Sequence, residues 1–487
     1  MIKIINGSEF SNYFNNKKSS KEDAEVNSIV NEIIAMVRSD GDIAVRHYSG
    51  RFEKSVPENF EVPLDAAKEA WENLKAAAPV LADALVLAAD HIRRFNELQK
   101  EQFRDFETEM EPGLFTGQKI IPVDRAAIYV PAGRFPLISS ALMGLIPAAV
   151  AKVRETILVS PPGKNGLPDS RILAAAHLAG ANRIFAIGGA QAIAALAIGT
   201  ETIPKVDLIV GAGNKYVAAA KRLLYGEVGI DFMAGPTDVL IITESFAVQK
   251  KERDIKNGTE YSAENGTASN NISCADLVAA DLLAQAEHDP DACPRALVPD
   301  METAEQIAAA LRLRLAKLAP NANKIATANA VSNATTANPA ANAAFIASNS
   351  IANAEASLKA NGLIIIYSSK EEAIDIANRI APEHLELHVS SPDEWVSGLR
   401  NYGSLFIGSM TAEVLGDYSA GINHTLPTSS SARFTGGLSV RNFLKCVTTL
   451  RCASGSGYTK AIEAAEIIAK AEGLACHAES ACIRKKT

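Results

Sequence analysis

The sequence feature that most constrains the fold is an alternation of two kinds of segment between residues 126 and 243. Short runs rich in aliphatic and β-branched residues carry Gly or Pro at a turn, and Ala- and Leu-rich segments lie between them. Strand–turn–helix alternation at this spacing predicts a parallel sheet with helices on both faces. The β-rich runs are AAIYVPAG (126–133), ETILVSPPG (155–163), NRIFAIGGA (182–190), VDLIVGAGN (206–214) and MAGPTDVLIIT (233–243).

The flanking segments are consistent with this class of fold. Residues from about 20 to 110 have apolar residues at helical spacing, and Gly41 is expected to end the first helix. Towards the C-terminus, NGLIIIYSS (361–369) predicts a strand, KEEAIDIANRIA (370–381) a helix and HLELHV (384–389) another short strand. A chain of 487 residues is long enough for two to four domains.

Two stretches differ in composition from their surroundings. Residues from about 246 to 272 are polar and rich in Asn, Gly and Ser, and residues from about 320 to 356 are Ala/Asn/Ser low complexity. The second stretch could be weakly helical, but it lacks an apolar stripe. Such segments bury little apolar surface. We therefore expect both to be surface loops, partly disordered, inserted into the fold.

Charge, hydropathy and cysteine usage exclude several classes of protein. The net charge of −8 argues against nucleic acid or an anionic membrane as the main partner, because both require clustered Lys and Arg. The most apolar run, 137–153, is interrupted by Pro147 and is shorter than the roughly 18–20 residues of a membrane helix. With no secretory pattern at the N-terminus, we expect a cytoplasmic protein. The six cysteines lack CxxC spacing and are expected to be free thiols packed as small apolar side chains.

Two pairs of polar residues suggest chemistry. In DLLAQAEHDP (281–290), Gln285 and His288 are three residues apart and would share one face of a helix, where an imidazole and an amide carbonyl could bind a metal. A capped polar helix end is the alternative. In PEHLEL (382–387), Glu383 and His384 are adjacent, which suits proton transfer because a carboxylate raises the pKa of an imidazole. The alternative there is a surface pair at the edge of a strand.

Two later segments carry further candidates. LGDYSAGINHTLPT (415–428) places Asp417 and His424 in a turn-rich loop whose glycines permit close approach to a ligand. EGLACHAE (472–479) carries Glu472 and His477 on the last helical segment. Five of the eight histidines follow residue 280, a distribution that fits a zinc-type site assembled from distant segments but does not establish one.

Two glycine turns suggest nucleotide binding. GAGNKYV (211–217) follows a strand and opens a helix, but Tyr216 occupies the third glycine position of the usual dinucleotide fingerprint. GGAQAIAALA (188–197) leads into a helix N-terminus, where backbone N–H groups favour phosphate. Either stretch could instead be an ordinary tight turn between a strand and a helix.

Taken in this order, the motifs resemble those of the histidinol dehydrogenase family. The resemblance extends from about residue 25 to residue 485 apart from the two inserts. It implies the oxidation of L-histidinol to L-histidine through L-histidinaldehyde in histidine biosynthesis, with two NAD⁺ reduced per substrate and one Zn²⁺ per subunit. It also implies a homodimer with shared active sites. The matching segments are YVPAGR, GGAQAIAALA, GAGNKYV, AGPTDVL, DLLAQAEHD, PEHLEL, GDYSAGINHTLPT, RFTGGLSV and EGLACHA.

The resemblance also implies roles for particular residues. His384 would accept the alcohol proton as hydride leaves, and Glu383 would activate water to hydrate the aldehyde. Glu472 and His477 would reach the active site of the partner subunit. The implied zinc ligands are Gln285, His288, Asp417 and His477. The implied substrate-binding residues are Thr237, Gln285, His288, His384, Asp417, Glu472 and His477. The implied NAD-binding residues are Tyr129, Gln191 and Asn214.

The expected architecture is α/β, with two Rossmann-like parallel-sheet domains, a helical N-terminal segment and a C-terminal dimerisation arm. We expect the N-terminal segment to pack on the second α/β domain, which also carries both inserts. The C-terminal arm would be exchanged between the two subunits. The expected bounds are 1–111 for the helical segment, 112–240 for the NAD-binding domain, 241–395 for the second α/β domain and 396–487 for the arm.

Some motifs depart from the usual family pattern and leave two alternatives open. AGPTD replaces AGPSE, so Thr237 keeps a hydroxyl and Asp238 is a shorter carboxylate, while VPAG and GAGN replace VPGG and GPGN. One alternative is a related zinc- and NAD-dependent dehydrogenase of another small diol such as sulfopropanediol. The other is a non-catalytic metal- or nucleotide-binding scaffold, against which the retained ligands and base argue.

Overall fold

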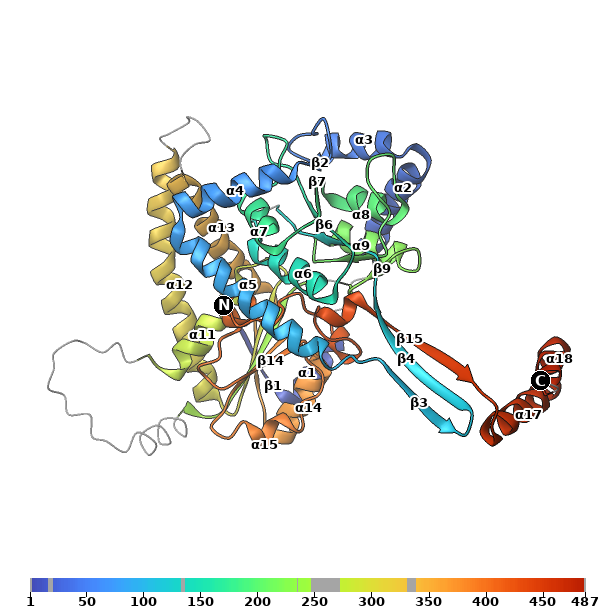
Figure 1. Ribbon diagram of the computed structural model, residues 1–487. Coiled ribbons are helices and arrows are strands. Elements are labelled where there is room, and N and C mark those ends of the chain that lie inside the picture. The colour runs from blue at the N-terminus through green and yellow to red at the C-terminus, as the bar shows by residue number, and fades with distance from the viewer. Residues whose placement is uncertain are drawn as a thin grey trace.

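The protein has a two-sheet body from which an arm projects (Figure 1). The computed structural model describes residues 2–15, 21–132, 136–233, 235–246, 272–330 and 339–485. Within this part of the chain, two six-stranded sheets are each covered by helices on both faces, and a three-stranded sheet leads into the arm. The expected α/β class with two parallel sheets is confirmed.

The first sheet is formed by six strands, β2 (Glu61–Val62), β5 (Arg125–Tyr129), β6 (Glu155–Ser160), β7 (Arg183–Ala186), β8 (Leu208–Val210) and β9 (Gly229–Ile230). Their order is β2-β7-β6-β5-β8-β9, and all neighbours are parallel except the edge strand β2. Successive residues of a strand point to opposite faces, and here both faces are buried. Ala126 and Ile128 pack into one core cluster, whereas Ala127 and Tyr129 pack into the other.

Eight helices cover the first sheet, and they include the N-terminal ones. One face is covered by α4 (Leu64–Ala77), α5 (Pro79–Lys100), α6 (Ile138–Ala151) and α7 (Ser170–Ala179). The other face is covered by α2 (Lys21–Asp40), α3 (Asp42–Phe52), α8 (Gly189–Ile198) and α9 (Lys215–Leu224). Helix α2 ends before Gly41, as predicted. The expectation that the N-terminal helices pack on the second domain was wrong for α2 to α5, whose apolar faces are buried in the two cores of the first sheet. It holds for α1 (Gly7–Asn15), which packs on the second sheet.

The second sheet is fully parallel and contains β1 (Lys3–Asn6), β10 (Asp238–Thr243), β11 (Cys293–Val298), β12 (Leu363–Ile366), β13 (His384–His388) and β14 (Ser404–Ile407). Their order is β1-β12-β11-β10-β13-β14. One face carries α1 (Gly7–Asn15), α14 (Lys370–Ile380) and α15 (Asp393–Val396), and the other carries α11 (Cys274–Ala286), α12 (Met301–Ala330) and α13 (Pro339–Ala360). The strand predicted at 233–243 thus begins the second domain rather than ending the first.

The second low-complexity insert is helical where it is described. It provides the end of α12 and most of α13, two helices that pack against each other (Figure 1). Alanine-rich segments have high intrinsic helix propensity, and Ala354 and Leu358 bury an apolar edge of α13 in the core. The expectation of a surface loop was therefore wrong for these helices. Residues 331–338 and most of the first insert, 247–271, lie outside the described residues.

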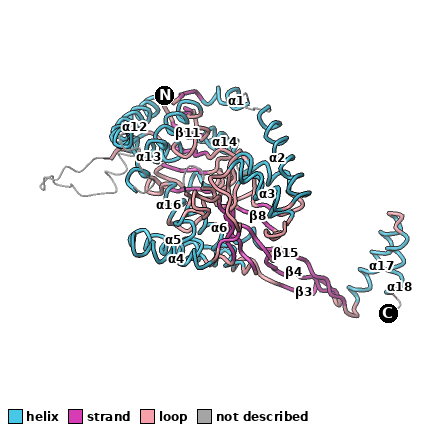
Figure 2. Tube along the Cα trace, turned by 90° about the horizontal axis from the view of Figure 1, so that it is seen from above, coloured by secondary structure: helices cyan, strands magenta, loops and turns pink. Residues whose placement is uncertain are grey.

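The arm combines segments that are distant in the sequence. It consists of β3 (Phe106–Glu111), β4 (Leu114–Pro122), β15 (Leu444–Cys452), α17 (Ser456–Ala471) and α18 (Ala475–Arg484). The three strands form an antiparallel sheet in the order β15-β4-β3, and α17 and α18 stand away from the body in both views (Figures 1 and 2). The predicted arm boundary at 396 was too early, since β14 pairs in the second sheet. The predicted start of the NAD-binding domain at residue 112 was also too early, because β4 (Leu114–Pro122) belongs to the arm.

The connecting residues bring opposite edges of the two sheets together. Strand β9 ends at Ile230 and β10 begins at Asp238, so residues 231–237 run from the carboxyl edge of the first sheet to the amino edge of the second. Helix α16 (Glu413–Tyr418) and the short 3₁₀ helices η1 (Ser431–Arg433) and η2 (Val440–Phe443) follow β14. The two edges therefore face a common region.

The helices and the cysteines bear on two expectations from the sequence, the absence of a membrane span and the presence of free thiols. Among the described helices, none has the length and apolar character needed to cross a membrane. All six cysteines are free, as expected. They are not core residues, however, because Cys446, Cys452 and Cys476 are exposed on the arm and the other three are only partly buried.

Candidate active site and metal centre

A group of potential metal ligands lies at the amino edge of the second sheet. His288, Glu413 and Asp417 place one ligand atom each within 4.8 Å of one another. Helix α11 begins with a Ser273–Asp276 capping box and ends just before His288, whereas Glu413 and Asp417 are one turn apart on α16. Imidazole and carboxylate ligands in this number suit zinc and similar divalent cations.

Gln285 faces the same group from the last turn of α11, where it is fully buried. Its amide nitrogen donates to the hydroxyl of Thr237, and its amide oxygen points towards the carboxylate of Glu413. Two acceptors that face each other are favourable when a cation lies between them. Without a cation, rotation of the amide would give a hydrogen bond to Glu413 and another, of 3.2 Å, from Asp238 N–H to the amide oxygen. The donor set thus fits a metal, and the sequence prediction missed Glu413.

Glu383 is held at the start of β13 by the start of β10. One of its carboxylate oxygens accepts hydrogen bonds from the Thr237 hydroxyl and from the N–H of Asp238, the latter at 3.1 Å. In return, the N–H of Glu383 donates to Asp238 at 2.9 Å, and Arg295 pairs with the other oxygen of Asp238 at 2.8 Å. Parallel neighbours begin at the same edge, so residues that precede β10 and β13 meet. Thr237, Gln285 and Glu383 therefore form one hydrogen-bonded chain.

The environment of Glu383 and His384 shifts their titration. Burial raises the pKa of Glu383 to about 7, although His384 and Thr237 oppose the change. Burial lowers the pKa of His384, but the negative charges of Glu413 and Glu383 outweigh burial and raise it overall. A carboxyl group whose pKa lies near neutrality, as that of Glu383 does, can give and take protons at working pH. The adjacent pair predicted from the sequence is thus buried rather than a surface pair.

His384 has two differently placed ring nitrogens. Nδ1 lies 3.4 Å from Glu413 Oε1 and 3.4 Å from the carbonyl oxygen of Asp238. Nε2 is buried, makes no hydrogen bond within the described residues and lies 3.7 Å from Asp417 Oδ1. Two acceptors near Nδ1 favour the tautomer that carries its proton there. Nε2 is then the nitrogen free to accept a proton.

His424 connects the two domains beside Asp417. Its Nδ1 lies 2.9 Å from the carbonyl oxygen of Asp417, and its Nε2 lies 3.0 Å from the hydroxyl of Ser140 at the start of α6. Burial lowers the pKa of His424, so the ring stays neutral near pH 7. The turn-rich loop singled out in the sequence therefore folds against the site, with Asp417 on α16 rather than in the loop itself.

A second polar cluster lies on α11 and β13. Asp281, Glu386 and His388 also place ligand atoms within 4.8 Å of one another, and Glu386 Oε2 is 3.1 Å from His388 Nε2. Burial and the charge of Glu386 raise the pKa of Asp281 to about 8, which keeps that carboxyl protonated. The remaining oxygen of Glu386 accepts the N–H of Glu413 at 3.0 Å. We interpret this cluster as a structural one that holds the start of α16 through the hydrogen bond from Glu413 to Glu386.

The three expected NAD-contacting residues lie at the carboxyl edge of the first sheet. Tyr129 ends β5, and Asn214 follows β8, on the other side of the point where the strand order reverses. Crevices at such switch points bind dinucleotides in doubly wound folds. The hydroxyl of Tyr129 accepts the N–H of Gly189 at 3.1 Å, two residues before Gln191. Asn214 caps α9 by accepting N–H groups at 3.0 and 3.1 Å.

The N-terminus of α8 already holds a carboxylate. Glu53, at the end of α3, accepts the N–H of Gly188 and, at 3.3 Å, the amide of Gln191. Burial raises the pKa of Glu53 to about 6. The glycine turn at 188–189 is therefore occupied by the protein's own anion, which favours the tight-turn interpretation over a phosphate site there. No sequence signal pointed to Glu53.

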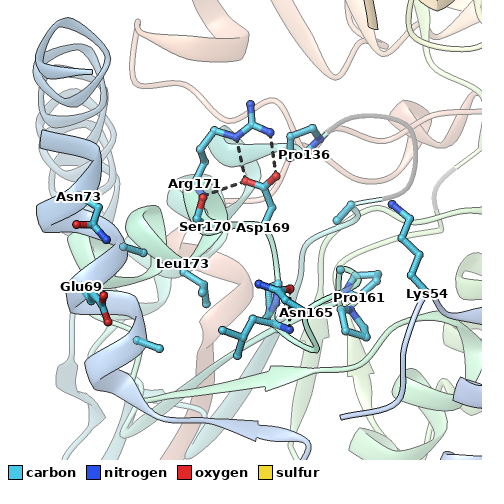
Figure 3. A pocket seen from close by; sticks show the side chains of 17 residues that line it. Lys54, Glu69, Asn73, Pro136, Pro161, Asn165, Asp169, Ser170, Arg171 and Leu173 are labelled. Carbon is cyan, nitrogen blue, oxygen red and sulfur yellow. Dashed lines mark hydrogen bonds and ion pairs between the residues drawn. The ribbon is translucent and has the colours of Figure 1, made fainter. Parts of the chain in front are cut away.

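A cavity of about 620 Å³ lies at the same edge, between α4 and the start of α7 (Figure 3). Lys54 and Pro161 contribute to its wall, and Arg171 forms paired contacts with Asp169 at 2.9 and 2.8 Å. The candidate metal ligands do not line it. The cavity is therefore separate from the metal centre, and none of Tyr129, Gln191 and Asn214 lines it either.

Glu472 and His477 are not brought to this site within one chain. Glu472 follows α17, and His477 lies in α18, so both are exposed on the projecting arm (Figures 1 and 2). The other implied ligands, Gln285, His288 and Asp417, do converge. The structure thus assembles three of the four implied zinc ligands from one chain.

The fold and site define a class: an α/β protein with a dinucleotide-type switch point in its first sheet and a candidate metal and acid/base centre at its second. Comparison with known proteins narrows the class, because the family model described as histidinol dehydrogenase matches residues 16–251, 263–354 and 324–485. The chain belongs to the histidinol dehydrogenase family, whose members are NAD-dependent enzymes of histidine biosynthesis that use zinc.

Individual relatives support the same assignment over nearly the full length. The chain is 40% identical over 466 residues to histidinol dehydrogenase of Methylococcus capsulatus, covering 95% of this chain and 92% of the relative. It is 40% identical over 463 residues to the enzyme of Thermus thermophilus, covering 95% of each. The crystal structure of histidinol dehydrogenase from Elizabethkingia anophelis matches with a TM-score of 0.79 at 29% identity, covering 100% of this chain and 98% of that one. Histidinol dehydrogenase activity follows for this chain.

Proposed function

We propose that this chain oxidises L-histidinol in two hydride transfers at the site formed by Thr237, Glu383 and His384. The observation that carries the proposal is the hydrogen-bonded chain from Gln285 through Thr237 to Glu383, placed beside the cluster of His288, Glu413 and Asp417. These hydrogen-bonded residues lie at the edge of the second sheet that faces the expected NAD-binding residues. The implied NAD contacts are Tyr129, Gln191 and Asn214.

One Zn²⁺ per subunit would be held by Gln285, His288 and Asp417, with His477 of the partner subunit completing the set. When bound, the ion supplies a Lewis acid that holds and orients the nitrogen atoms of the substrate. Glu413 offers a further carboxyl group within the same 4.8 Å group. Burial raises the pKa of Glu413 well above its ordinary value, so this residue can release a proton when a cation arrives.

His384 serves as the base in the first oxidation. Nε2 takes the proton of the alcohol hydroxyl while hydride passes to NAD⁺ from the carbon that bears this hydroxyl. The products are the aldehyde and one NADH. The imidazolium that forms is stabilised by Glu413 at 3.4 Å and by Asp417 at 3.7 Å. These carboxylates are fixed before the reaction, so the developing charge meets an environment that is already oriented.

Glu383 serves as the base in the second oxidation. It takes a proton from water as the water oxygen adds to the aldehyde carbon, which gives the anion of the hydrate. Loss of hydride from that carbon to a second NAD⁺ gives the carboxylic acid and a second NADH, and the acid releases its proton to solvent to give the carboxylate of L-histidine. The pKa of about 7 that burial gives Glu383 matches this task near neutral pH. Thr237 orients the carboxylate by donating to it.

A homodimer would complete the site through the arm. Helices α17 and α18 contact each other, yet Ile467, Ile468 and Ile483 are 66%, 58% and 53% exposed in the single chain. An arm with so thin a core needs another surface to cover it. Docking on a second copy would bring Glu472 of the partner subunit and His477 of the partner subunit to the open side of the metal cluster. A cytoplasmic location remains part of this proposal.

The high identity to histidinol dehydrogenases decides against the two sequence alternatives. The substitution of AGPSE by AGPTD is tolerated because Thr237 still supplies the hydroxyl and Asp238 pairs with Arg295. The decisive experiment measures NADH formed per histidinol consumed. We expect two NADH per substrate and loss of turnover with a chelator, restored by Zn²⁺. A yield of one NADH, or full activity after verified metal removal, would contradict the scheme.

A further inference from the structure

An ion pair lies completely inside the protein next to the turn that carries Asn214. Lys221 of α9 and Asp231, which follows β9, contact each other, and their side chains are only 2% and 0% exposed. Removing two charges from water is costly unless their remaining hydrogen-bonding groups are satisfied. Such a pair is therefore retained for a positional reason more readily than for stability alone.

Both members of the pair hold the same glycine. Asp231 Oδ2 accepts the N–H of Gly211 at 2.8 Å, while the ammonium group of Lys221 donates to the carbonyl oxygen of Gly211 at 2.8 Å. Gly211 has φ of 108°, and a Cβ at this position would strike the carbonyl of Tyr129. The two charged side chains thus fix Gly211, the first residue of the 211–214 turn, in close contact with Tyr129 at the end of β5.

The same pair anchors the connection between the two sheets. Asp231 is the first residue of the segment 231–237, and its Oδ1 also accepts the N–H of Phe232 at 2.7 Å. At the other end of that segment, Thr237 contacts Glu383 and Gln285. One short stretch of chain therefore has the cofactor turn fixed at its start and the catalytic carboxylate at its end.

We propose that the Lys221–Asp231 ion pair is a positioning device that holds the 211–214 turn in the conformation that binds NAD⁺. This inference rests on the proposed placement of NAD⁺ at Tyr129 and Asn214. Neither charged group needs to touch the cofactor, since both act through the backbone of Gly211. Loss of the pair should then weaken NAD⁺ binding more than it changes the chemistry at Glu383 and His384.

The test uses full-length, zinc-loaded protein with Lys221→Met, which keeps the length of the side chain and removes its charge. We expect the Kd and KM for NAD⁺ to rise about tenfold or more, while kcat at saturating NAD⁺ and KM for histidinol change by less than about threefold. The Kd is measured by direct titration with NAD⁺ alone. Zinc content should stay at the wild-type value.

The matched control is Glu155→Gln. It removes the partner of Arg125, an ion pair at the amino edge of the same sheet and away from the cofactor turn. The control should lower thermal stability and leave the Kd for NAD⁺ unchanged. A proportional fall of all kinetic parameters in Lys221→Met, matching a loss of folded protein, would show a merely structural role and overturn the inference.

A second variant keeps the test decisive if Lys221→Met fails to fold. Gly211→Ala leaves both charges in place and displaces the turn through the contact with Tyr129. It should show the same selective loss of NAD⁺ affinity, and a wild-type Kd in either folded variant would overturn the inference. Wild-type protein that binds NAD⁺ but yields no NADH from histidinol would refute the proposed function without bearing on the role of the ion pair.

Discussion

The two sheets present opposite edges to the same region of the molecule, and the two edges differ in chemistry. The first sheet offers its carboxyl edge, where ligands are bound in most open α/β sheets. Its expected contacts, Tyr129, Gln191 and Asn214, are neutral side chains at turns. The second sheet offers its amino edge, where Glu383 precedes β13 and Thr237 precedes β10. One edge thus supplies backbone turns, and the other supplies side chains fixed by strand register.

The difference separates binding from chemistry. Two NAD⁺ molecules must enter and leave per substrate in the proposed reaction, which suits neutral contacts that bind without holding tightly. Proton transfer and metal binding require charges, and three buried or nearly buried carboxylates surround His384 at the other edge. Changes at the second edge should therefore reduce turnover, whereas changes at the first should act on NAD⁺ affinity or stability.

The largest effect is expected for His384→Asn. This change removes the base while keeping a side chain of similar shape, so turnover should fall by roughly 10²–10⁴. Zinc content and thermal stability should stay close to the wild-type values. The measurements are steady-state NADH formation, metal analysis and thermal unfolding.

The matched control is His388→Gln on the same face of β13. His388 is equally buried, at 3% exposure, but lies against Glu386 rather than at the proposed substrate side. It should change turnover by less than about tenfold. Equal losses of turnover in the two variants would mean that the contrast reflects damage to β13 and not a base at His384.

Much of this arrangement was predictable from the sequence. The alternation of apolar runs and Ala-rich segments predicted parallel sheets. This signal is local, because strand period, helix spacing and turn residues are properties of short segments. Gln285, His288 and Asp417 were placed in one site by the family resemblance, since the spacing of Gln285 and His288 alone left a capped helix end as the alternative. The adjacent Glu383 and His384 were likewise visible as a pair.

The residues that were missed depend on contacts between distant segments. Glu413 is an acidic residue in an unremarkable helix, and only the approach of α16 to α11 makes it part of the metal group. Glu53 reaches Gly188 across 135 positions of sequence. Helices α2 to α5 were assigned to the wrong sheet for the same reason, since an amphipathic helix does not specify which apolar surface covers it. Sequence periodicity carries no information about such partners.

An intermediate effect is expected from mixing two inactive variants, which tests whether the arm completes the second edge. His288→Ala removes a ligand from the body, and His477→Ala removes one from the arm, so each homodimer should lose zinc and turnover. If the arm is exchanged, each mixed dimer has one intact site. Equal mixing after dissociation and reassociation should then restore about a quarter of wild-type turnover.

The control mixes His288→Ala with Asp417→Asn, two changes in the same body. Both halves of such a mixed dimer carry a damaged site, whichever subunit supplies the arm, so turnover should stay low. Recovery in this control, or none in the first mixture despite verified exchange of subunits, would place His477 outside the partner's site.

The smallest effect is expected at the first edge and concerns stability rather than turnover. Burial raises the pKa of Glu53 from an ordinary 4.5 to about 6. The folded state therefore binds this proton more tightly than the unfolded state does. The associated stability is fully present below about pH 4.5 and is lost as pH rises through 6, by about 2 kcal/mol. Glu53→Gln removes this dependence and keeps an oxygen for Gly188.

The unfolding free energy of wild type minus that of Glu53→Gln should therefore decrease between pH 4.5 and pH 7, as measured by denaturant titration. Glu61→Gln gives the opposite sign. The pKa of Glu61 is lowered by its hydrogen bond from Arg183, so its contribution is present at neutral pH and is lost as pH falls. A flat difference for Glu53 beside a sloping one for Glu61 would show that Glu53 is not buried at the α8 N-terminus. That N-terminus would then be free to bind phosphate.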